Sequence, residues 1–144
     1  MRPIDDSRDF IPVRIAVLTV SDSRSLTEAR SGDVLAARIE AAGHVVACRR
    51  ILPDERAEIA ALLRDWSRDA EVDVVITTGG TGLTGRDVTP EALDRVKDKD
   101  IPGFGELFRQ LSYADIGTST IQSRAVGGLA NGTLIFSLPG SSGA

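Results

Sequence analysis

A glycine-rich run with adjacent hydroxyl and carboxylate side chains is the part of the sequence best suited to chemistry. Residues 77–87 read TTGGTGLTGRD, and four of them are glycines, namely Gly79, Gly80, Gly82 and Gly85. Glycine lets the backbone adopt positive φ and lets a ligand approach closely. Consecutive N–H groups in such a turn form an anion-binding concavity without any lysine. The run therefore predicts a phosphate-bearing small ligand, and Asp87 stands where it could hold a metal ion or a hydroxyl group.

Two familiar phosphate-binding motifs come close to this run, and neither is met. Residues 80–85 satisfy G-x-G-x-x-G, but the dinucleotide fingerprint needs a helix that opens inside the glycines and an acidic residue ending the next strand. Here the helix is expected to begin only at Pro90. A P-loop would require Lys and Ser/Thr where Arg86 and Asp87 stand, and a carboxylate there would repel phosphate. An NAD-binding oxidoreductase is therefore disfavoured.

The composition bounds the class of protein. A chain of 144 residues with 42% apolar and 26% charged residues is typical of one soluble globular domain. Its net charge of −4 disfavours a nucleic-acid partner. The sequence has no apolar run of membrane-spanning length and no signal-peptide core. A single cysteine, Cys48, excludes an internal disulfide and fits a reducing compartment. We therefore expect a cytoplasmic protein with no membrane partner.

Strands and helices alternate along the sequence. Strands are predicted at residues 13–20, 44–52 and 72–76, and helices at residues 32–42, 56–68 and 90–96. Thr89 is predicted to be the N-cap of the last of these helices. Residues 101–105 are expected to form a turn before a short helix at 106–111, and residues 118–124 are ambiguous.

The end of the chain carries a hairpin signal, because Asn131-Gly132 suits a type I′ turn between strands at 125–130 and 133–138. The whole pattern predicts an α/β fold, a three-layer α/β/α sandwich whose sheet is mostly parallel, with one antiparallel strand from the hairpin. Residues 1–12 are expected to be a flexible arm and residues 13–144 a single domain.

Four predicted strands are followed by polar or glycine-rich loops. These loops contain Asp22, Asp54, residues 77–87 and residues 139–142. Ligands of such folds sit beyond the carboxyl ends of the strands, so one pocket with carboxylates, hydroxyls and backbone donors is predicted. Simpler roles remain open: Asp54 and Asp87 could cap neighbouring helices, and Asp22 could form a turn.

Three segments together resemble the MogA/MoaB family of molybdenum cofactor biosynthesis proteins, which is related to the gephyrin G domain. They are TTGGTGLTGRDVTPEAL at residues 77–93, IPGFGELFR at 101–109 and LANGTLIFSLPGSSGA at 129–144. SDSRS at residues 21–25 and LPDE at 52–55 agree with them. The resemblance covers nearly all of residues 13–144. The segment STIQSRAVGGLANGT and the final PGSSGA favour the MoaB branch.

The resemblance implies a reaction. Members adenylylate molybdopterin: molybdopterin and ATP, with Mg²⁺, give adenylylated molybdopterin and pyrophosphate. Asp54 of the PDE motif and Asp87 of the glycine-rich motif match the acidic residues needed for catalysis, and we assign both to Mg²⁺. The resemblance also implies a homotrimer, or a hexamer of two stacked trimers, and a downstream metal-insertion protein as a partner. An alternative is a catalytically weak MoaB-type accessory protein that binds molybdopterin or nucleotide without turnover.

The expected contacts to molybdopterin and ATP come from four strand ends. They are Ser21, Asp22, Ser23, Thr78, Gly79, Gly80, Thr81, Gly82, Pro139, Gly140 and Ser141. Arg24, Arg86 and Arg124 are further candidates for phosphate contacts. Similar proteins continue past the final PGS(S/T)GA turn into a C-terminal helix, whereas this sequence stops at Ala144. Either the sequence is truncated at this point or the helix is absent, and its absence would affect packing near the pocket.

Overall fold

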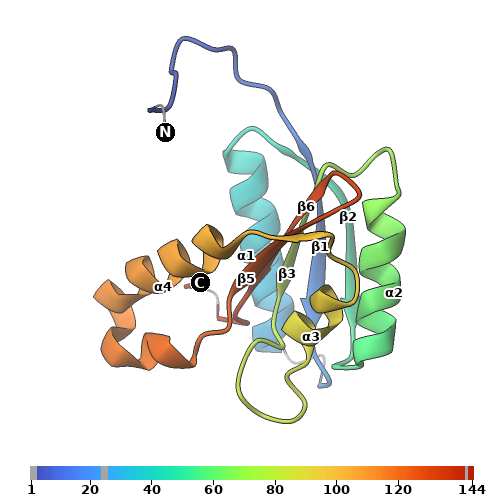
Figure 1. Cartoon of the computed structure of the whole chain (residues 1–144), viewed down its shortest axis with the longest axis vertical. Helices are drawn as coiled ribbons and strands as arrows, with labels where there is room; N and C mark the ends of the chain where they lie inside the picture. Colours follow the sequence, from blue (N-terminus) through green and yellow to red (C-terminus); the bar gives the residue numbers. More distant parts are fainter. Residues whose placement is uncertain (1–2, 24–25, 142) are drawn as a thin grey trace.

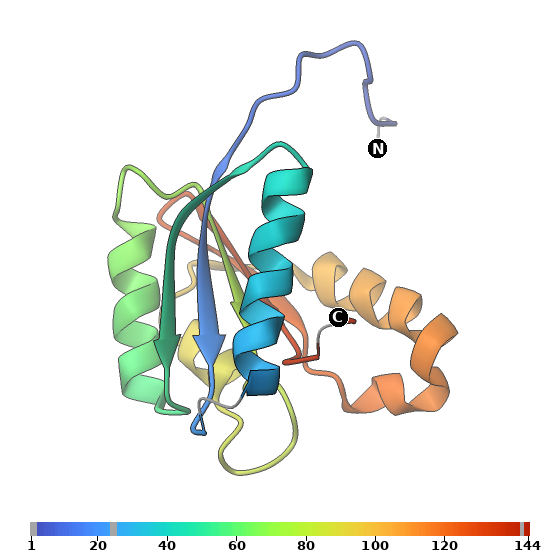
Figure 2. The ribbon, with the colours of Figure 1, turned by 180° about the vertical axis from the view of Figure 1, so that it is seen from behind.

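A computed structural model describes residues 3–23, 26–141 and 143–144. Within them, six strands form one sheet, and helices cover both of its faces (Figures 1 and 2). The strands are β1 (Arg14–Val20), β2 (Val45–Leu52), β3 (Val74–Thr78), β4 (Lys99–Asp100), β5 (Val126–Ala130) and β6 (Thr133–Leu138). The helices are α1 (Leu26–Ala41), α2 (Arg56–Ser67), α3 (Thr89–Asp94), α4 (Pro102–Ile116) and the 3₁₀ helix η1 (Gly117–Gln122).

The strand order is β2-β1-β3-β6-β5-β4. The first four strands run parallel, β5 is antiparallel to β6, and β4 is antiparallel to β5. The predicted mostly parallel sheet with an antiparallel strand from the hairpin is therefore confirmed. The predicted hairpin turn is also present, since Asn131 and Gly132 both have positive φ, 49° and 80°, as a type I′ turn requires.

Each face of the sheet has its own apolar core. On one face, α2 and α3 pack their buried side chains, among them Leu63 and Leu93, against Leu18 and Ile135 of the strands. On the other face, Ile39 of α1 joins Ile15 and Val17. Helix α4 covers the remainder of that face, with Phe104 and Phe136 ring centroids 4.7 Å apart, and then projects away from the sheet (Figure 2). The two cores align the carboxyl ends of β1, β3 and β6 at one edge.

Two differences between the predicted and observed element boundaries bear on the site. Helix α1 begins at Leu26 rather than Gly32, because residues 26–31 contain too few apolar residues for helical periodicity to be visible. Strand β3 begins at Val74 and continues through Thr78. Thr77 and Thr78 pair with Leu18 and Thr19 of β1, so the two threonines of the motif belong to the strand and the loop starts at Gly79.

The prediction that Thr89 is the N-cap of α3 is wrong. The N-cap is Val88, with no side-chain capping bond, and Thr89 is the first residue of the helix. The hydroxyl of Thr89 donates to the carbonyl of Gly79 at 3.0 Å. Thr89 is fully buried, so its hydroxyl stabilises the glycine-rich loop from within the core.

One long helix replaces the turn and short helix predicted at residues 101–111. Helix α4 begins at Pro102 and includes Gly103 and Gly105, two glycines that lower the intrinsic helix propensity. Gly105 allows a close approach, because a Cβ there would lie 2.6 Å from the carbonyl oxygen of Ala125. The ambiguous segment after it forms η1. Strand β4 was not predicted, because a strand of two residues is too short to show an alternation of apolar and polar side chains.

The segment before β1 extends away from the rest of the chain (Figure 1). Residues 3–13 contain no helix or strand, and the ring of Phe10 lies with its centroid 5.0 Å from that of His44. The flexibility of this arm stays a prediction. None of the helices in the described ranges is long and apolar enough to cross a membrane.

Candidate active site

A pocket of about 430 Å³ lies beyond the carboxyl end of β3. The glycine loop, defined as residues 79–88, forms one side of it. Most of the predicted site residues meet here: Asp54, Gly79, Gly80, Thr81, Gly82, Asp87, Pro139 and Gly140 line the pocket. The structure therefore brings the two predicted catalytic carboxylates to the same cavity as the predicted backbone donors.

The glycine loop needs its first two glycines. Gly79 and Gly80 have φ values of 101° and 70°, which side chains rarely allow. A Cβ on Gly79 would lie 2.3 Å from the carbonyl oxygen of Val20, and one on Gly80 would lie 2.3 Å from the Thr89 hydroxyl. The N–H of Gly79 donates to Leu138 at 3.0 Å. The loop is thus packed directly on the ends of β1 and β6.

Asp87 is the last residue of the loop tip, defined as residues 82–87 of the glycine loop. Its Oδ2 accepts hydrogen bonds from the N–H of Thr84 at 2.9 Å and from the Thr84 hydroxyl at 2.7 Å. No donor among the described residues reaches its Oδ1, which leaves one oxygen for a ligand. The N-cap of α3 is Val88, so the alternative that Asp87 caps this helix is wrong.

Asp54 lies between β2 and α2 and lines the pocket beside Gly80 of the glycine loop. The N-cap of α2 is Glu55, without a side-chain capping bond, so the capping alternative for Asp54 is also wrong. Its Oδ1 lies 3.1 Å from the place a Cβ of Gly80 would occupy. Burial of the carboxyl, and then the charges of Asp22 and Asp87, raise the pKa of Asp54 above its ordinary value, with Arg86 opposing them.

Asp54→Asn is expected to stabilise the protein at neutral pH. A raised pKa means that the folded chain binds more protons than the unfolded chain above 3.8, the ordinary pKa, so stability falls as the pH rises through the window between 3.8 and the raised value. Asparagine cannot ionise, so the variant escapes this loss. Urea unfolding at neutral pH should give a larger free energy of unfolding for the variant, and the difference should disappear below pH 3.8. A variant less stable than its parent at neutral pH would contradict the assignment.

Asp22 does not line the pocket but holds Arg86. Arg86 donates to both carboxylate oxygens of Asp22, each at 2.9 Å, and to Glu55 at 3.3 Å. The N–H of Asp54 donates to Asp22 as well, at 2.9 Å. Hydrogen bonds from Arg86 and then from the Asp54 backbone lower the pKa of Asp22. This cluster ties the glycine loop to the ends of β1 and β2, and the Arg86 guanidinium is already paired rather than turned toward a phosphate.

The remaining predicted contacts do not line the main pocket. Ser21 is buried, and its N–H donates to Leu52 at 2.8 Å. The Thr78 hydroxyl lies 2.5 Å from that of Ser31 and donates to the Pro139 carbonyl at 3.2 Å. Thr78 and Ser141 line a separate cavity of about 30 Å³. Ser21, Ser23, Thr78 and Ser141 are all outside the lining of the main pocket. Arg24 lies outside the described residues.

The wall opposite the glycine loop comes from residues that sequence reasoning missed. Ile116 at the end of α4 and Ser119, Gln122 and Ser123 in and after η1 line the pocket. None of them belongs to a recognisable ligand-binding motif, and the segment is ambiguous in secondary structure. They reach the pocket only because α4 continues to Ile116 and η1 turns the chain back toward β5.

The carboxylates suit a magnesium ion that is shared with a substrate. Within the described ranges, no group of three or more His, Cys, Asp or Glu side chains could hold a metal on its own. Mg²⁺ is usually bound by one or two carboxylates together with substrate phosphates. No donor among the described residues binds Oδ1 of Asp87. Burial, and then the like charges of Asp22 and Asp87, raise the pKa of Asp54, and a bound cation would offset those charges. The residues present therefore fit Mg²⁺ bound with a phosphate ligand.

Comparison with known proteins places the fold and the sequence in one family. The family model described as "Probable molybdopterin binding domain" matches residues 16–144. Molybdenum cofactor biosynthesis protein B of Escherichia coli K12 is 50% identical over 135 residues, which are 94% of this chain and 79% of that protein.

Solved structures agree with this match. A crystal structure of molybdenum cofactor biosynthesis protein B superposes with a TM-score of 0.88 at 43% identity, covering 94% of this chain and 85% of the other. The tungsten cofactor synthesizing protein MoaB from Pyrococcus furiosus gives 0.82 at 34% identity, over 92% and 85% of the two chains. The chain therefore belongs to the molybdopterin-binding-domain family, in the MoaB branch of the molybdenum cofactor biosynthesis proteins.

Proposed function

We propose that this protein adenylylates molybdopterin with ATP and Mg²⁺, giving adenylylated molybdopterin and pyrophosphate in the cytoplasm. One observation carries the proposal: the pocket combines the backbone of Gly79–Gly82 with the carboxylates of Asp54 and Asp87. Backbone donors can position an anionic ligand, and carboxylates can hold the cation that two polyanionic substrates need. Membership of the family supplies molybdopterin as the substrate class.

The proposed reaction is a displacement at phosphorus. A terminal phosphate oxygen of molybdopterin attacks the α-phosphorus of ATP and forms a P–O bond to it. The bond from that phosphorus to the bridging oxygen breaks, and pyrophosphate leaves with the electron pair. The attacking phosphate is already ionised, so no side chain has to remove a proton. The one histidine of the sequence, His44, directly precedes β2. It therefore lies at the amino-terminal ends of the parallel strands, whereas the pocket lies beyond their carboxyl ends.

The protein groups would then act by positioning and by binding the cation. Asp54 and Asp87 would hold Mg²⁺, which neutralises charge that develops on the departing pyrophosphate. The N–H groups of Gly79–Gly82 would orient a phosphate or the pterin. Holding two substrates in line removes much of the entropic barrier to a bimolecular step.

A second candidate function has an observation in its favour. Among the described residues, no lysine or arginine lines the pocket, and Arg86 and Arg124 are paired with Asp22 and Glu91. A pocket without a cationic side chain is weakly equipped to stabilise a phosphoryl-transfer transition state. This observation favours an accessory protein that binds molybdopterin or nucleotide without turnover.

One experiment separates the two functions. The protein is incubated with molybdopterin, ATP and Mg²⁺, and adenylylated molybdopterin is followed by mass spectrometry. More than one equivalent of product per chain is expected for the enzyme. Tight molybdopterin binding without product would favour the accessory role, and no binding of either substrate would contradict both.

We also propose that the protein assembles as a homotrimer or a hexamer of two trimers, and delivers its product to a metal-insertion protein. Exposed apolar residues on α4 and η1, namely Leu107, Leu111, Ile116 and Ile121, support an interface on this projecting arm. Light scattering at micromolar concentration should report a trimer or a hexamer. A monomer at that concentration would contradict the proposed assembly.

A further inference from the structure

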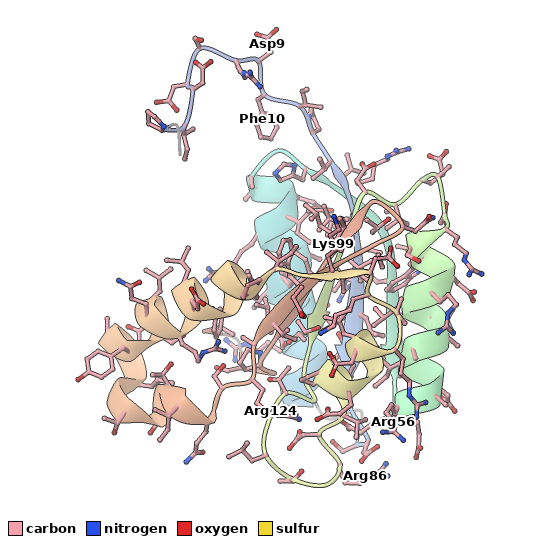
Figure 3. All side chains as sticks on the ribbon, viewed as in Figure 1. Asp9, Phe10, Arg56, Arg86, Lys99 and Arg124 are labelled. Atoms are coloured by element: carbon pink, nitrogen blue, oxygen red, sulfur yellow. The ribbon has the colours of Figure 1, made fainter. Side chains whose placement is uncertain are left out.

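We propose that Arg124 is a positioning residue, which fixes the glycine loop and with it the Asp87 carboxylate without contacting a substrate. Its kinetic test rests on the proposed adenylylation, whereas its structural test does not. Arg124 follows η1 and precedes β5, on the side of the molecule where the parallel strands end (Figure 3). Its side chain does not line the pocket.

The guanidinium of Arg124 joins the two ends of the loop tip. Nε donates to the carbonyl of Gly82 at 2.8 Å, and Nη2 donates to the carbonyl of Asp87, also at 2.8 Å. Nη1 forms an ion pair with Glu91 of α3, and hydrogen bonding from Arg124 lowers the pKa of Glu91. One side chain therefore bridges the beginning of the tip, its end and the helix that follows.

This bridge bears directly on the position of the Asp87 carboxylate. A Cβ on Gly82 would lie 2.7 Å from Asp87 Oδ2, so the carboxylate is packed against the Gly82 backbone. The same Oδ2 is held by Thr84 in the middle of the tip. If Arg124 released the carbonyls of Gly82 and Asp87, the two ends of the tip could separate, and the Asp87 carboxylate would lose its fixed position at the pocket.

A second arginine, Arg109, fixes the backbone on both sides of Arg124. Arg109 of α4 donates through Nη1 to the carbonyls of Ser123 and Ala125, at 3.3 and 3.0 Å, and these residues flank Arg124. Gly105 leaves room for it, because a Cβ there would lie 2.7 Å from Arg109 Nη2. The two arginines in series thus set the spacing between the glycine loop and the η1 wall of the pocket.

Lysine cannot replace Arg124 in this role. The guanidinium presents several N–H donors in a rigid plane, whereas an ammonium group is a compact point charge on a flexible stem. Three acceptors on Gly82, Asp87 and Glu91 surround the guanidinium, at positions that one ammonium would not match together. Arg124→Lys therefore keeps the charge and removes the bridging geometry.

The test compares Arg124→Lys and Arg124→Ala with Arg14→Lys as a matched control. Arg14 binds Asp73 and Glu71 at the amino-terminal start of β1, remote from the pocket. For both Arg124 variants we expect kcat to fall by about 10–100-fold and the Mg²⁺ concentration for half-maximal rate to rise by a similar factor, as for other residues that orient metal ligands. KM for ATP should change little. Millimolar guanidinium should restore part of the Arg124→Ala rate.

Hydrogen exchange of the substrate-free protein gives the readout that is independent of turnover. The amides of Thr84 and Asp87, which are bonded within the tip, should exchange faster in Arg124→Lys than in the parent or in Arg14→Lys. An Arg124→Lys variant with parent kcat and parent exchange would overturn the inference. So would lost turnover with unchanged exchange, because Arg124 would then act on the substrate itself. If the parent shows no turnover, the proposed function fails, and the exchange comparison still decides the role of Arg124.

Discussion

Replacement of Asp87 by asparagine is expected to lower kcat for adenylylation by about 10²–10³-fold, the loss typical of removing one preorganised electrostatic contact. An amide oxygen can still accept the two hydrogen bonds that Thr84 donates to Asp87. The Arg124 bond goes to the backbone carbonyl of Asp87, which the substitution leaves in place. The variant should therefore keep the loop and lose only the charge proposed to hold Mg²⁺.

Turnover is measured by mass spectrometry of adenylylated molybdopterin, with binding measured by titration calorimetry. Asp33→Asn is the matched control, since Asp33 is an exposed carboxylate of α1 paired with Arg49. The expected pattern is parent-like molybdopterin binding and thermal unfolding for both variants, with the loss of rate confined to Asp87→Asn. Turnover at the parent rate in Asp87→Asn would show that this carboxylate has no part in the reaction.

Gly79→Ala should produce the largest loss of stability from a single added methyl group. The residue has φ of 101°, and its Cβ would lie 2.3 Å from the carbonyl oxygen of Val20, which is backbone and cannot rotate away. Backbone strain and overpacking each cost about 1–3 kcal/mol, so we expect the free energy of unfolding to fall by about 2–6 kcal/mol. Urea unfolding of the two proteins measures the difference.

Gly85→Ala provides the control within the same loop. No heavy atom outside its immediate neighbours lies within 4 Å of a Cβ built on Gly85, so its effect should stay within about 0.5 kcal/mol. The two substitutions add the same group to the same loop, so a difference between them isolates the close approach of Gly79 to β1. Equal effects would mean that the loop is not held against the Val20 carbonyl in solution.

Features that depend on local chemistry were predictable from the sequence. Positive φ favours glycine, and to a lesser extent asparagine, and close backbone contact favours glycine, so Gly79 and Gly80 indicate a loop at the end of a strand. Asn131-Gly132 predicted its type I′ turn for the same reason. Apolar runs for buried parallel strands predicted the layered sheet and the edge where Asp54 and Asp87 meet in one pocket.

The sequence-based predictions of helices and element boundaries were wrong where local preference and tertiary packing disagree. Gly103 and Gly105 weaken the local helix signal of residues 101–111, yet α4 forms there as one helix. Phe104 packs on Phe136, and Gly105 accommodates the Ala125 carbonyl. Packing contributes more to helix stability in proteins than propensity does, and those packing partners lie far along the chain.

The sequence by itself determined the strand, the glycine loop and the carboxylates that end beside it, because each depends on residues adjacent in the chain. Only the tertiary structure decided what those groups contact. Asp22 and Arg86 are 64 residues apart, and Gly82 and Arg124 are 42 apart. The sequence offered Arg86 and Arg124 as candidates for phosphate contacts, and it could not show that they pair with Asp22 and Glu91. Hydrogen bonds across such separations form only after the sheet and α4 have brought the partners together, and no local pattern encodes them.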